Sequence, residues 1–387
     1  MGLAKNNTDK NIIIREPAEI KYKEELEFLR ANDDESKRPK NWQLSPKQVI
    51  KFILGSNEPI EQPSTSKGKS KSSKETFTIS KKFYGDEILI QRTVASLASN
   101  KALMLIGEPG TAKSYLSELL ASAISGSSIN TIQGSASVTE DQIKYSWNYA
   151  LLLAKGPSRE SLVSAPMLKG FEEGSIVRFE EITRCAPEIQ DTILSLLSDK
   201  VMVIPELDDK GVIFAKNGFG LVATANTRDR GVNEMSSALK RRMNFETIKP
   251  LQDVELEMEL VSEQVTEYLE NASIQREVVP DVIELLTTTF NELRNGKSVT
   301  GDKVERLAQV TMSTAECVET AINTAVYSHY LEDGPMSPHS AAISMKGTII
   351  KDSLDDISKL RNFFQIVVKN RTEKHWKEFY KSGLEIL

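Results

Sequence analysis

One glycine-rich segment restricts the fold of this chain more than any other feature. Residues 107–114 read Gly-Glu-Pro-Gly-Thr-Ala-Lys-Ser and directly follow the apolar run at 102–106. Between a strand and a helix, such glycines let backbone N–H groups turn inward and surround phosphate oxygens, while the lysine reaches the terminal phosphates. A helix beginning near Tyr115 points its positive end at the same anion. The segment predicts a phosphate-binding loop, and the alternative is a chance Gly/Ser loop.

The loop supplies most of the candidate nucleotide contacts. Ala112 stands where the usual pattern has its second glycine, so a residue with a methyl group must adopt backbone angles that favour glycine. The Ser114 hydroxyl is the expected Mg²⁺ ligand from this segment. The candidate contacts are Glu108, Pro109, Gly110, Thr111, Ala112, Lys113, Ser114 and Tyr115.

Length and composition place the chain among ordinary globular proteins of two or three domains. It has 387 residues, of which 39% are hydrophobic and 27% charged. No run approaches the length of a membrane-spanning helix, and the N-terminus lacks an apolar signal core. Cys185 and Cys317 fall in helix-like contexts without metal-ligand spacing, so we expect two reduced thiols in a cytoplasmic protein.

Charge is distributed unevenly along the chain. Residues 1–82 hold 17 Lys and Arg against 12 Asp and Glu, although the whole chain carries a net charge of −6. The remainder is therefore acidic. Because a nucleic-acid groove usually needs a basic face, this balance argues against nucleic acid as the partner.

The N-terminal part reads as a helical segment at 1–55, followed by a linker at 56–76. One helix is expected near 22–31, and a second at 46–54 has Ser45 as N-cap, Pro46 at the first position and Gly55 after its end. Ser, Lys and Pro dominate the linker, which predicts disorder. Its lysines could contact an acidic partner, and a solvated tether is the favoured alternative.

From residue 77 the pattern changes to alternating helices and short apolar strands, and after 250 to helices alone. We therefore predict an α/β domain with an open parallel sheet at 77–250 and an all-α region at 251–387. Ser313 and Glu316 form a predicted capping box. The expected strands are 102–106, 129–133, 175–179, 221–225 and 246–251, and the expected C-terminal helices are 253–271, 280–294, 313–330 and 354–369.

Two carboxylates follow the third predicted strand. At the carboxyl end of a parallel strand, Glu180 and Glu181 would face the nucleotide crevice. Glu180 is the expected residue near Mg²⁺, and Glu181 is the expected orienting group or base for an attacking water. The alternative is a charged strand end without a role. Arg178, inside the strand, suggests that one face of the sheet is not fully covered.

Polar residues after the fourth strand complete the candidate site. Asn226 ends that strand, where its amide could bond the lytic water or a terminal phosphate, or merely cap a loop. Arg241 and Arg242 precede the fifth strand. An arginine supplied by a neighbouring subunit neutralises charge in phosphoryl transfer, whereas a surface basic cluster is the plainer interpretation.

Taken together, residues 83–330 resemble the AAA+ ATPases and, within them, the MoxR group. The resemblance implies that backbone near Tyr84 and Gly85 holds adenine, that Asn226 is the first sensor, and that Arg242, with Arg241 in reserve, is the arginine finger. The matching segments are 83–87, the loop at 107–114, the acidic pair with 181–187, a hairpin expected at 200–213, Asn226, and 239–243.

The resemblance implies an ATP- and Mg²⁺-dependent ring, a hexamer, which remodels a protein client, often one with a von Willebrand factor A domain. A nucleic-acid motor and a nucleotide-gated assembly module with weak turnover are the alternatives. The second is motivated by Glu180, where Asp is common, and by 313–316, where the family often has a sensor arginine. Tyr145, Trp147 and Tyr149 are expected either in the core or on an exposed loop for a partner.

Overall fold

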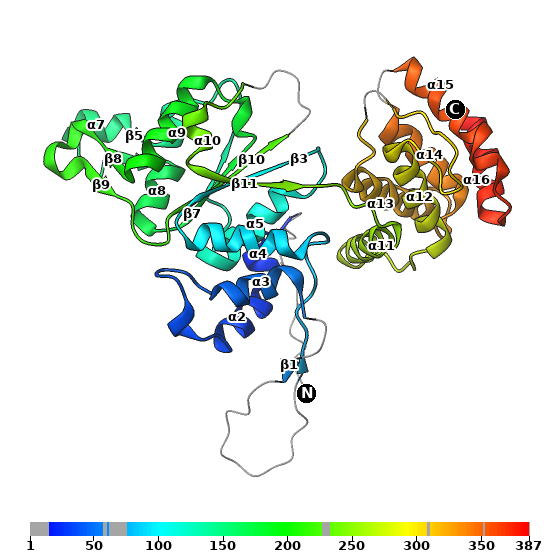
Figure 1. The fold of residues 1–387 in the computed structure, drawn as a ribbon, viewed down its shortest axis with the longest axis horizontal. Helices are drawn as coiled ribbons and strands as arrows, with labels where there is room; N and C mark the ends of the chain where they lie inside the picture. Colours follow the sequence, from blue (N-terminus) through cyan, green and yellow to red (C-terminus); the bar gives the residue numbers. More distant parts are fainter. Residues whose placement is uncertain are drawn as a thin grey trace, which may run out of the picture. The chain divides into compact units, whose positions relative to one another are not determined.

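The computed structural model describes residues 15–56, 60–61, 76–226, 233–307, 310–350 and 353–386. The chain divides into two compact units (Figure 1). The first, here called the α/β unit, comprises residues up to 105, 114–225 and 230–246, and the second, the helical unit, comprises 106–113, 226–229 and 247–387. Across the described ranges, none of the helices is both long and apolar enough to cross a membrane.

A five-stranded sheet forms the centre of the α/β fold, with helices drawn above and below it (Figure 1). Its strand order is β11-β3-β10-β7-β4, and β7 pairs in parallel with both β10 and β4. The central strands are almost entirely buried, as expected for parallel strands covered on both faces, and most of their residues are apolar; Arg178 and Glu180 of β7 are charged. The strands are β3 (Ala102–Gly107), β4 (Thr131–Gln133), β7 (Ile176–Glu180), β10 (Gly220–Asn226) and β11 (Met243–Ile248).

Four of the five predicted strands lie where the sequence places them, whereas the fifth was predicted three residues too late. It begins at Met243, directly after Arg242, and ends at Ile248. Pro250 lies beyond its end and has no N–H to give to a neighbouring strand. The buried residues of β11 are Met243, Glu246 and Ile248. Because Glu246 is charged, the sequence does not show an apolar residue at each buried position of this strand.

The helices of the α/β unit begin at recognisable signals. Asp86 caps α4 by accepting from the Ile88 N–H, and Pro166 and Pro187 start α8 and α9. Cys185 was predicted in a helix-like context, but it lies in extended backbone just before α9. The helices that flank the sheet are α4 (Glu87–Ala98), α5 (Lys113–Ser125), α8 (Pro166–Glu173), α9 (Pro187–Asp199) and α10 (Ser237–Lys240).

The N-terminal helices pack against α5. Glu118 of α5 is buried and accepts from the Ala18 N–H (3.0 Å) and from Arg15 (2.6 Å), and Glu19 accepts from Ser122 and Ser128. The predicted helices are confirmed as α2 (Lys23–Ala31) and α3 (Pro46–Leu54), which follow α1 (Ala18–Lys21). Residues 1–14 and all of the predicted linker except 56, 60–61 and 76 lie outside the described residues.

Two small hairpins interrupt the α/β pattern. The hairpin expected at 200–213 is confirmed as β8 (Val201–Val203) paired antiparallel with β9 (Val212–Phe214). Tyr145 and Trp147 lie on β5 (Tyr145–Trp147), which pairs with β6 (Leu162–Ser164), and both side chains are half-buried. Tyr149, at the start of α7 (Tyr149–Lys155), is 72% exposed, so the three aromatics do not share one environment.

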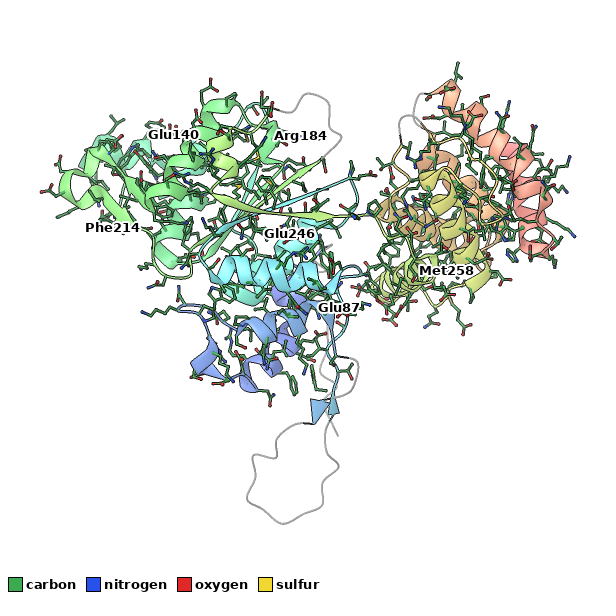
Figure 2. The ribbon with its side chains drawn as sticks, viewed as in Figure 1. Glu87, Glu140, Arg184, Phe214, Glu246 and Met258 are labelled. Atoms are coloured by element: carbon green, nitrogen blue, oxygen red, sulfur yellow. The ribbon has the colours of Figure 1, made fainter. Side chains whose placement is uncertain are left out.

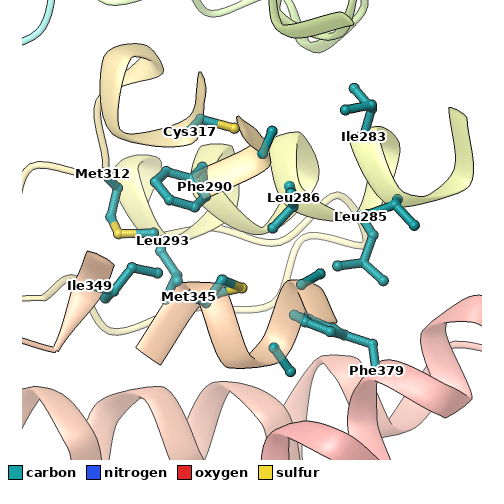
Figure 3. Packing of buried hydrophobic residues seen from close by; sticks show 14 of the residues in the cluster. Ile283, Leu285, Leu286, Phe290, Leu293, Met312, Cys317, Met345, Ile349 and Phe379 are labelled. Atoms are coloured by element: carbon teal, nitrogen blue, oxygen red, sulfur yellow. The ribbon is translucent and has the colours of Figure 1, made fainter. Parts of the chain in front are cut away.

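In the described residues from 247 on, six α-helices make up the helical unit. Their apolar faces meet in one core, to which Leu286, Phe290 and Leu293 of α12 and Met345 of α14 contribute (Figure 3). The predicted capping box opens α13, as expected. The helices are α11 (Val254–Asn271), α12 (Pro280–Asn295), α13 (Thr314–Leu331), α14 (Pro338–Ile349), α15 (Leu354–Ile366) and α16 (Lys374–Ile386).

Two of these helices, α14 and α16, were not predicted from the sequence. α14 is rich in Ser, Ala and Gly, so its sequence shows little contrast between an apolar and a polar face. It is nevertheless buried, and its Ser340 accepts and donates within a cluster with Ser328. α15 ends at Ile366 rather than 369, and a short 3₁₀ turn at Val368–Asn370 separates it from α16.

Candidate functional site

The glycine-rich loop lies between β3 and α5, as predicted. Gly110 and Ala112 both have positive φ, +74° and +61°, so the alanine adopts a left-handed conformation that usually favours glycine. At Gly107 an added Cβ would lie 2.4 Å from the Ile248 carbonyl oxygen, which only glycine avoids. The Lys113 ammonium donates to the carbonyl oxygens of Glu108 (2.7 Å) and Gly107 (3.3 Å).

Glu180, at the end of β7, is the centre of a buried polar network. Its Oε2 accepts from the hydroxyls of Ser114 (2.6 Å) and Thr224 (2.7 Å). Its Oε1 accepts from the Ser117 hydroxyl (2.7 Å) and from Arg178 Nη2 (3.0 Å). The carboxylate, 5% exposed, thereby joins α5 and β10.

Hydrogen bonds keep this carboxylate ionised despite its burial. Burial alone raises the pKa of Glu180, but the donors on Ser114, Ser117 and Thr224, together with the charge of Arg178, outweigh it and lower the pKa below the ordinary value. Glu180 is thus a fixed negative charge that points one oxygen at the Ser114 hydroxyl.

The position of Arg178 in the strand predicted that one face of the sheet is not fully covered, and this prediction was wrong. Arg178 is 9% exposed and its guanidinium is surrounded by acceptors: the Ser117 hydroxyl (2.8 Å), the Ser114 carbonyl (3.0 Å) and the Ser128 carbonyl (3.1 Å), besides Glu180. A planar guanidinium can satisfy several acceptors at once, which explains how this charge is buried inside the sheet layer.

The backbone of Glu181 adopts a left-handed conformation that neighbouring groups hold by hydrogen bonds. Its φ of +55° is uncommon for a non-glycine residue and turns the chain at the strand end. Its N–H donates to Thr224 Oγ1 (3.0 Å), and its Oε2 lies 3.6 Å from Arg184 Nε; Figure 2 labels Arg184. Gly134 packs against the same turn and donates its N–H to the Glu180 carbonyl (2.7 Å). The turn therefore aims two adjacent carboxylates in different directions.

The residues expected near adenine lie in a well-packed segment. Tyr84 is buried and the Lys81 ammonium lies 4.6 Å from its ring centroid. An added Cβ on Gly85 would lie 2.9 Å from the Phe83 ring. Tyr115 bonds the Tyr22 hydroxyl (2.8 Å), so part of this expected nucleotide contact faces the N-terminal helices.

The expected sensor and finger residues occupy different surroundings. Asn226 is the last residue of β10 and is half-buried. Arg241 caps the end of α10, and Arg242 is exposed and donates to Ser198 Oγ (3.1 Å). Residues 227–232, just after Asn226, lie outside the described ranges.

Tertiary structure adds three residues that sequence reasoning did not place in the site: Ser117, Thr224 and Arg178. Ser117 lies one helical turn after Ser114, and Thr224 two residues before Asn226 on the same strand. These spacings are visible in the sequence, but they become informative only once α5, β7 and β10 are known to be neighbours. Ser114 and Glu180 supply oxygen atoms, the donor type that Mg²⁺ prefers in proteins.

Comparison with known families agrees with this geometry. Residues 102–243 match the model of the AAA domain of the dynein-related subfamily, and residues 255–384 match that of the YehL-like AAA+ ATPase C-terminal domain. The first match covers the glycine-rich loop, both carboxylates and Arg242, and the second covers most of the helical unit.

Individual proteins show the same relation. YehL of Escherichia coli (strain K12) is 45% identical over 374 residues, which cover 96% of this chain and 97% of YehL. YojN of Bacillus subtilis (strain 168) is 27% identical over 158 residues, 41% of this chain and 50% of YojN.

The solved structures that match this chain share little sequence with it. NtrX from Brucella abortus in complex with ADP has a TM-score of 0.46 at 12% identity, over 78% of this chain and 64% of NtrX. A single-residue variant of RuvB from Thermotoga maritima has a TM-score of 0.42 at 13% identity, over 78% of this chain and 83% of RuvB. Nearly full-length identity to YehL, together with both family matches, carries the conclusion: the chain is a member of the YehL-like AAA+ ATPases.

Proposed function

We propose that this protein binds ATP with Mg²⁺ and hydrolyses it at the site built on the glycine-rich loop, Ser114, Glu180 and Glu181. The observation that carries the proposal is the 2.6 Å hydrogen bond from the Ser114 hydroxyl to Glu180. It joins the residue after the loop lysine to the carboxylate at the strand end. Serine and carboxylate are the pair that a magnesium-nucleotide site of this class requires.

Each residue has a distinct part in this proposal. The backbone of 107–112 surrounds the phosphates and Lys113 neutralises the terminal ones, once its ammonium leaves the loop carbonyls that it now contacts. Glu181 accepts a proton from the attacking water, and Asn226 orients that water or the γ-phosphate. Ser114 would bind Mg²⁺ through its hydroxyl, and Glu180 would lie beside the ion and support it through its hydrogen bond to that hydroxyl; the ion would neutralise the phosphate charge that develops during transfer.

Two variants test the proposal. Lys113→Ala removes the cation at the phosphates, so the protein should lose ATP affinity while its far-UV circular dichroism stays unchanged. Glu181→Gln keeps the shape of the side chain but removes the base, so it should bind ATP normally and hydrolyse it slowly. Equal nucleotide affinity in wild type and Lys113→Ala would contradict the loop assignment, and a wild-type hydrolysis rate in Glu181→Gln would contradict the base.

We further propose a homo-oligomeric ring, a hexamer, in which Arg242 acts on the nucleotide of a neighbouring subunit. Arg242 is exposed and lies at the end of α10, where its Nε contacts Ser198 of α9. An arginine supplied in this way is worth about 10³-fold or more in rate in other phosphoryl-transfer systems.

Mixed subunits test the action of Arg242 in trans. Arg242→Ala and Lys113→Ala subunits should each be inactive alone, whereas a mixed ring contains interfaces that pair an intact Arg242 with an intact loop. Those interfaces should recover hydrolysis. No recovery, with mixed assembly verified by native mass, would refute the trans role and favour Arg241 or a structural cluster.

The cellular role that we propose is that of a MoxR-like remodelling ATPase acting in the cytoplasm on a protein client, such as one with a von Willebrand factor A domain. The resemblance of the loop, the 181–187 segment and the β8–β9 hairpin to that group supports this assignment. Glu181→Gln protein loaded with ATP should retain the client in a pull-down. Salt-dependent DNA binding would instead favour a nucleic-acid motor.

A further inference from the structure

We propose that Arg178 is a positioning residue for the magnesium site: it holds Glu180 so that the carboxylate fixes the Ser114 hydroxyl and leaves that oxygen's lone pairs for the metal. The inference rests on the proposed function of the site. It goes further, because Arg178 lies two residues before the acidic pair and does not itself reach the nucleotide in this proposal.

The first step is a count of hydrogen bonds on Glu180. An ionised carboxylate offers about four lone-pair positions. Four donor groups lie within 3.0 Å, two on each oxygen: Ser114 and Thr224 on Oε2, Ser117 and Arg178 on Oε1. Ser117 has one proton and also lies 2.8 Å from the Ser114 carbonyl, and we assign the proton to the carboxylate because it is the stronger acceptor. With its acceptor positions filled, Glu180 acts on Mg²⁺ through Ser114 rather than as a direct ligand.

The second step concerns the Ser114 hydroxyl. A hydroxyl has one proton and two lone pairs. Because the Ser114 proton is given to Glu180 at 2.6 Å, both lone pairs stay available for a cation. The orientation of Ser114 therefore depends on Glu180 Oε2 staying where it is.

The third step is what keeps that oxygen in place. Arg178 contacts Oε1, on the opposite side of the carboxylate from Ser114, and so opposes its rotation. The same guanidinium donates to the Ser114 carbonyl and to the Ser117 hydroxyl, which ties the carboxylate to the first turn of α5. A fourth bond to the Ser128 carbonyl anchors it beside β4.

Side-chain length gives a reason for this arrangement. Glutamate has one more rotatable bond than the aspartate that is common at this position, so it needs more restraint to hold one orientation. Arg178 supplies a charge-assisted bond, which is about twice as strong as a neutral one. A lysine has a single ammonium centre and lacks the planar fork that spans these acceptors.

The test measures nucleotide affinity with and without Mg²⁺, using a fluorescent ATP analogue. In Arg178→Gln, affinity in EDTA should stay within about twofold of wild type, whereas the gain on adding Mg²⁺ should fall by about tenfold, the equivalent of one strong hydrogen bond. Arg159→Gln is the matched control. It breaks an ion pair to Glu172 of 2.7 Å at the surface of the same unit and should leave both affinities unchanged.

A double-variant cycle separates positioning from a general structural role. If Arg178 acts through Glu180, Arg178→Gln should cause no further loss of the Mg²⁺-dependent gain in a Glu180→Gln background. Equal losses in both backgrounds would overturn the inference, as would an unchanged gain in Arg178→Gln. Should Arg178→Gln not fold, Arg178→Lys enters the same cycle, with a partial loss expected. Wild-type protein without any Mg²⁺-dependent affinity would instead refute the proposed function itself.

Discussion

Gly134 provides a sharp test of how strongly activity depends on the turn at Glu180 and Glu181. An added Cβ on Gly134 would lie 2.3 Å from the Glu181 carbonyl oxygen and 2.8 Å from that of Glu180. Both atoms belong to the backbone, so no side-chain rotation relieves the overlap. Gly134 also donates its own N–H to the Glu180 carbonyl, which ties the two segments together. We predict that Gly134→Ala displaces the acidic turn.

The size of the displacement follows from the contact distances. Ordinary contacts of a Cβ atom begin at 3.4 Å, so the Glu181 carbonyl must move away by about 1 Å. A misplacement of about 1 Å at a reacting group costs about 10²-fold in rate. Overpacking a well-packed site costs about 1–3 kcal/mol in unfolding free energy. Gly134→Ala should therefore stay folded but hydrolyse ATP about 10²-fold more slowly.

The assay compares kcat for ATP hydrolysis, affinity for ATP, and thermal unfolding. Affinity should change little, since Gly134 lies just after the end of β4 rather than in the phosphate loop. Gly347→Ala is the control, because an added Cβ there meets nothing within 4 Å. It should leave all three measurements unchanged or slightly raise stability. A wild-type kcat in Gly134→Ala would refute the reasoning that the backbone of Glu180 and Glu181 must hold this course.

The remaining predictions concern buried charges and thiols. Burial, opposed by Glu25, lowers the pKa of Lys82 from 10.5 to about 8, so the folded state binds fewer protons than the unfolded state between these two pH values. In that window the unfolding free energy of wild type, measured with denaturant, should rise relative to that of Lys82→Met by at most about 1.4 kcal/mol per pH unit, and below it there should be no such rise. Burial raises the pKa of the Cys185 and Cys317 thiols, so neither should react with a thiol reagent at neutral pH until the protein unfolds; rapid labelling of native protein would contradict this. Arg294→Met leaves Glu257 buried without its 2.6 Å ion-pair partner and should lower the unfolding free energy by about 3–5 kcal/mol, whereas Arg294→Met combined with Glu257→Leu should regain much of it; additive losses on calorimetry would be evidence against the pair.

Local signals in the sequence were sufficient for most of the fold. The order strand, glycine-rich loop, lysine, serine and helix requires only neighbours along the chain, and β3 and α5 lie where it places them. The Ser313–Glu316 capping box and Pro46 are equally local, because a capping hydroxyl and a proline act within one turn of helix.

Local signals failed where tertiary contacts replace a regular apolar pattern. β11 carries a buried glutamate, Glu246, whose charge is paired with Arg92 at 2.7 Å, so alternation in the sequence misplaced the strand. α14 has small residues on every side, and only packing in the helical unit shows which face is buried.

The same distinction applies to the candidate site. Sequence alone determined that a lysine and a serine follow a phosphate loop and that two carboxylates end a strand, because these are neighbours along the chain. It took the tertiary structure to decide that Ser117, Thr224 and Arg178 all contact Glu180. Parallel pairing of β7 with β10 and the packing of α5 bring these residues together. The hydrogen bonds of Arg178 to Glu180 and its other acceptors then offset the cost of burying its charge, which no pattern of single residues encodes.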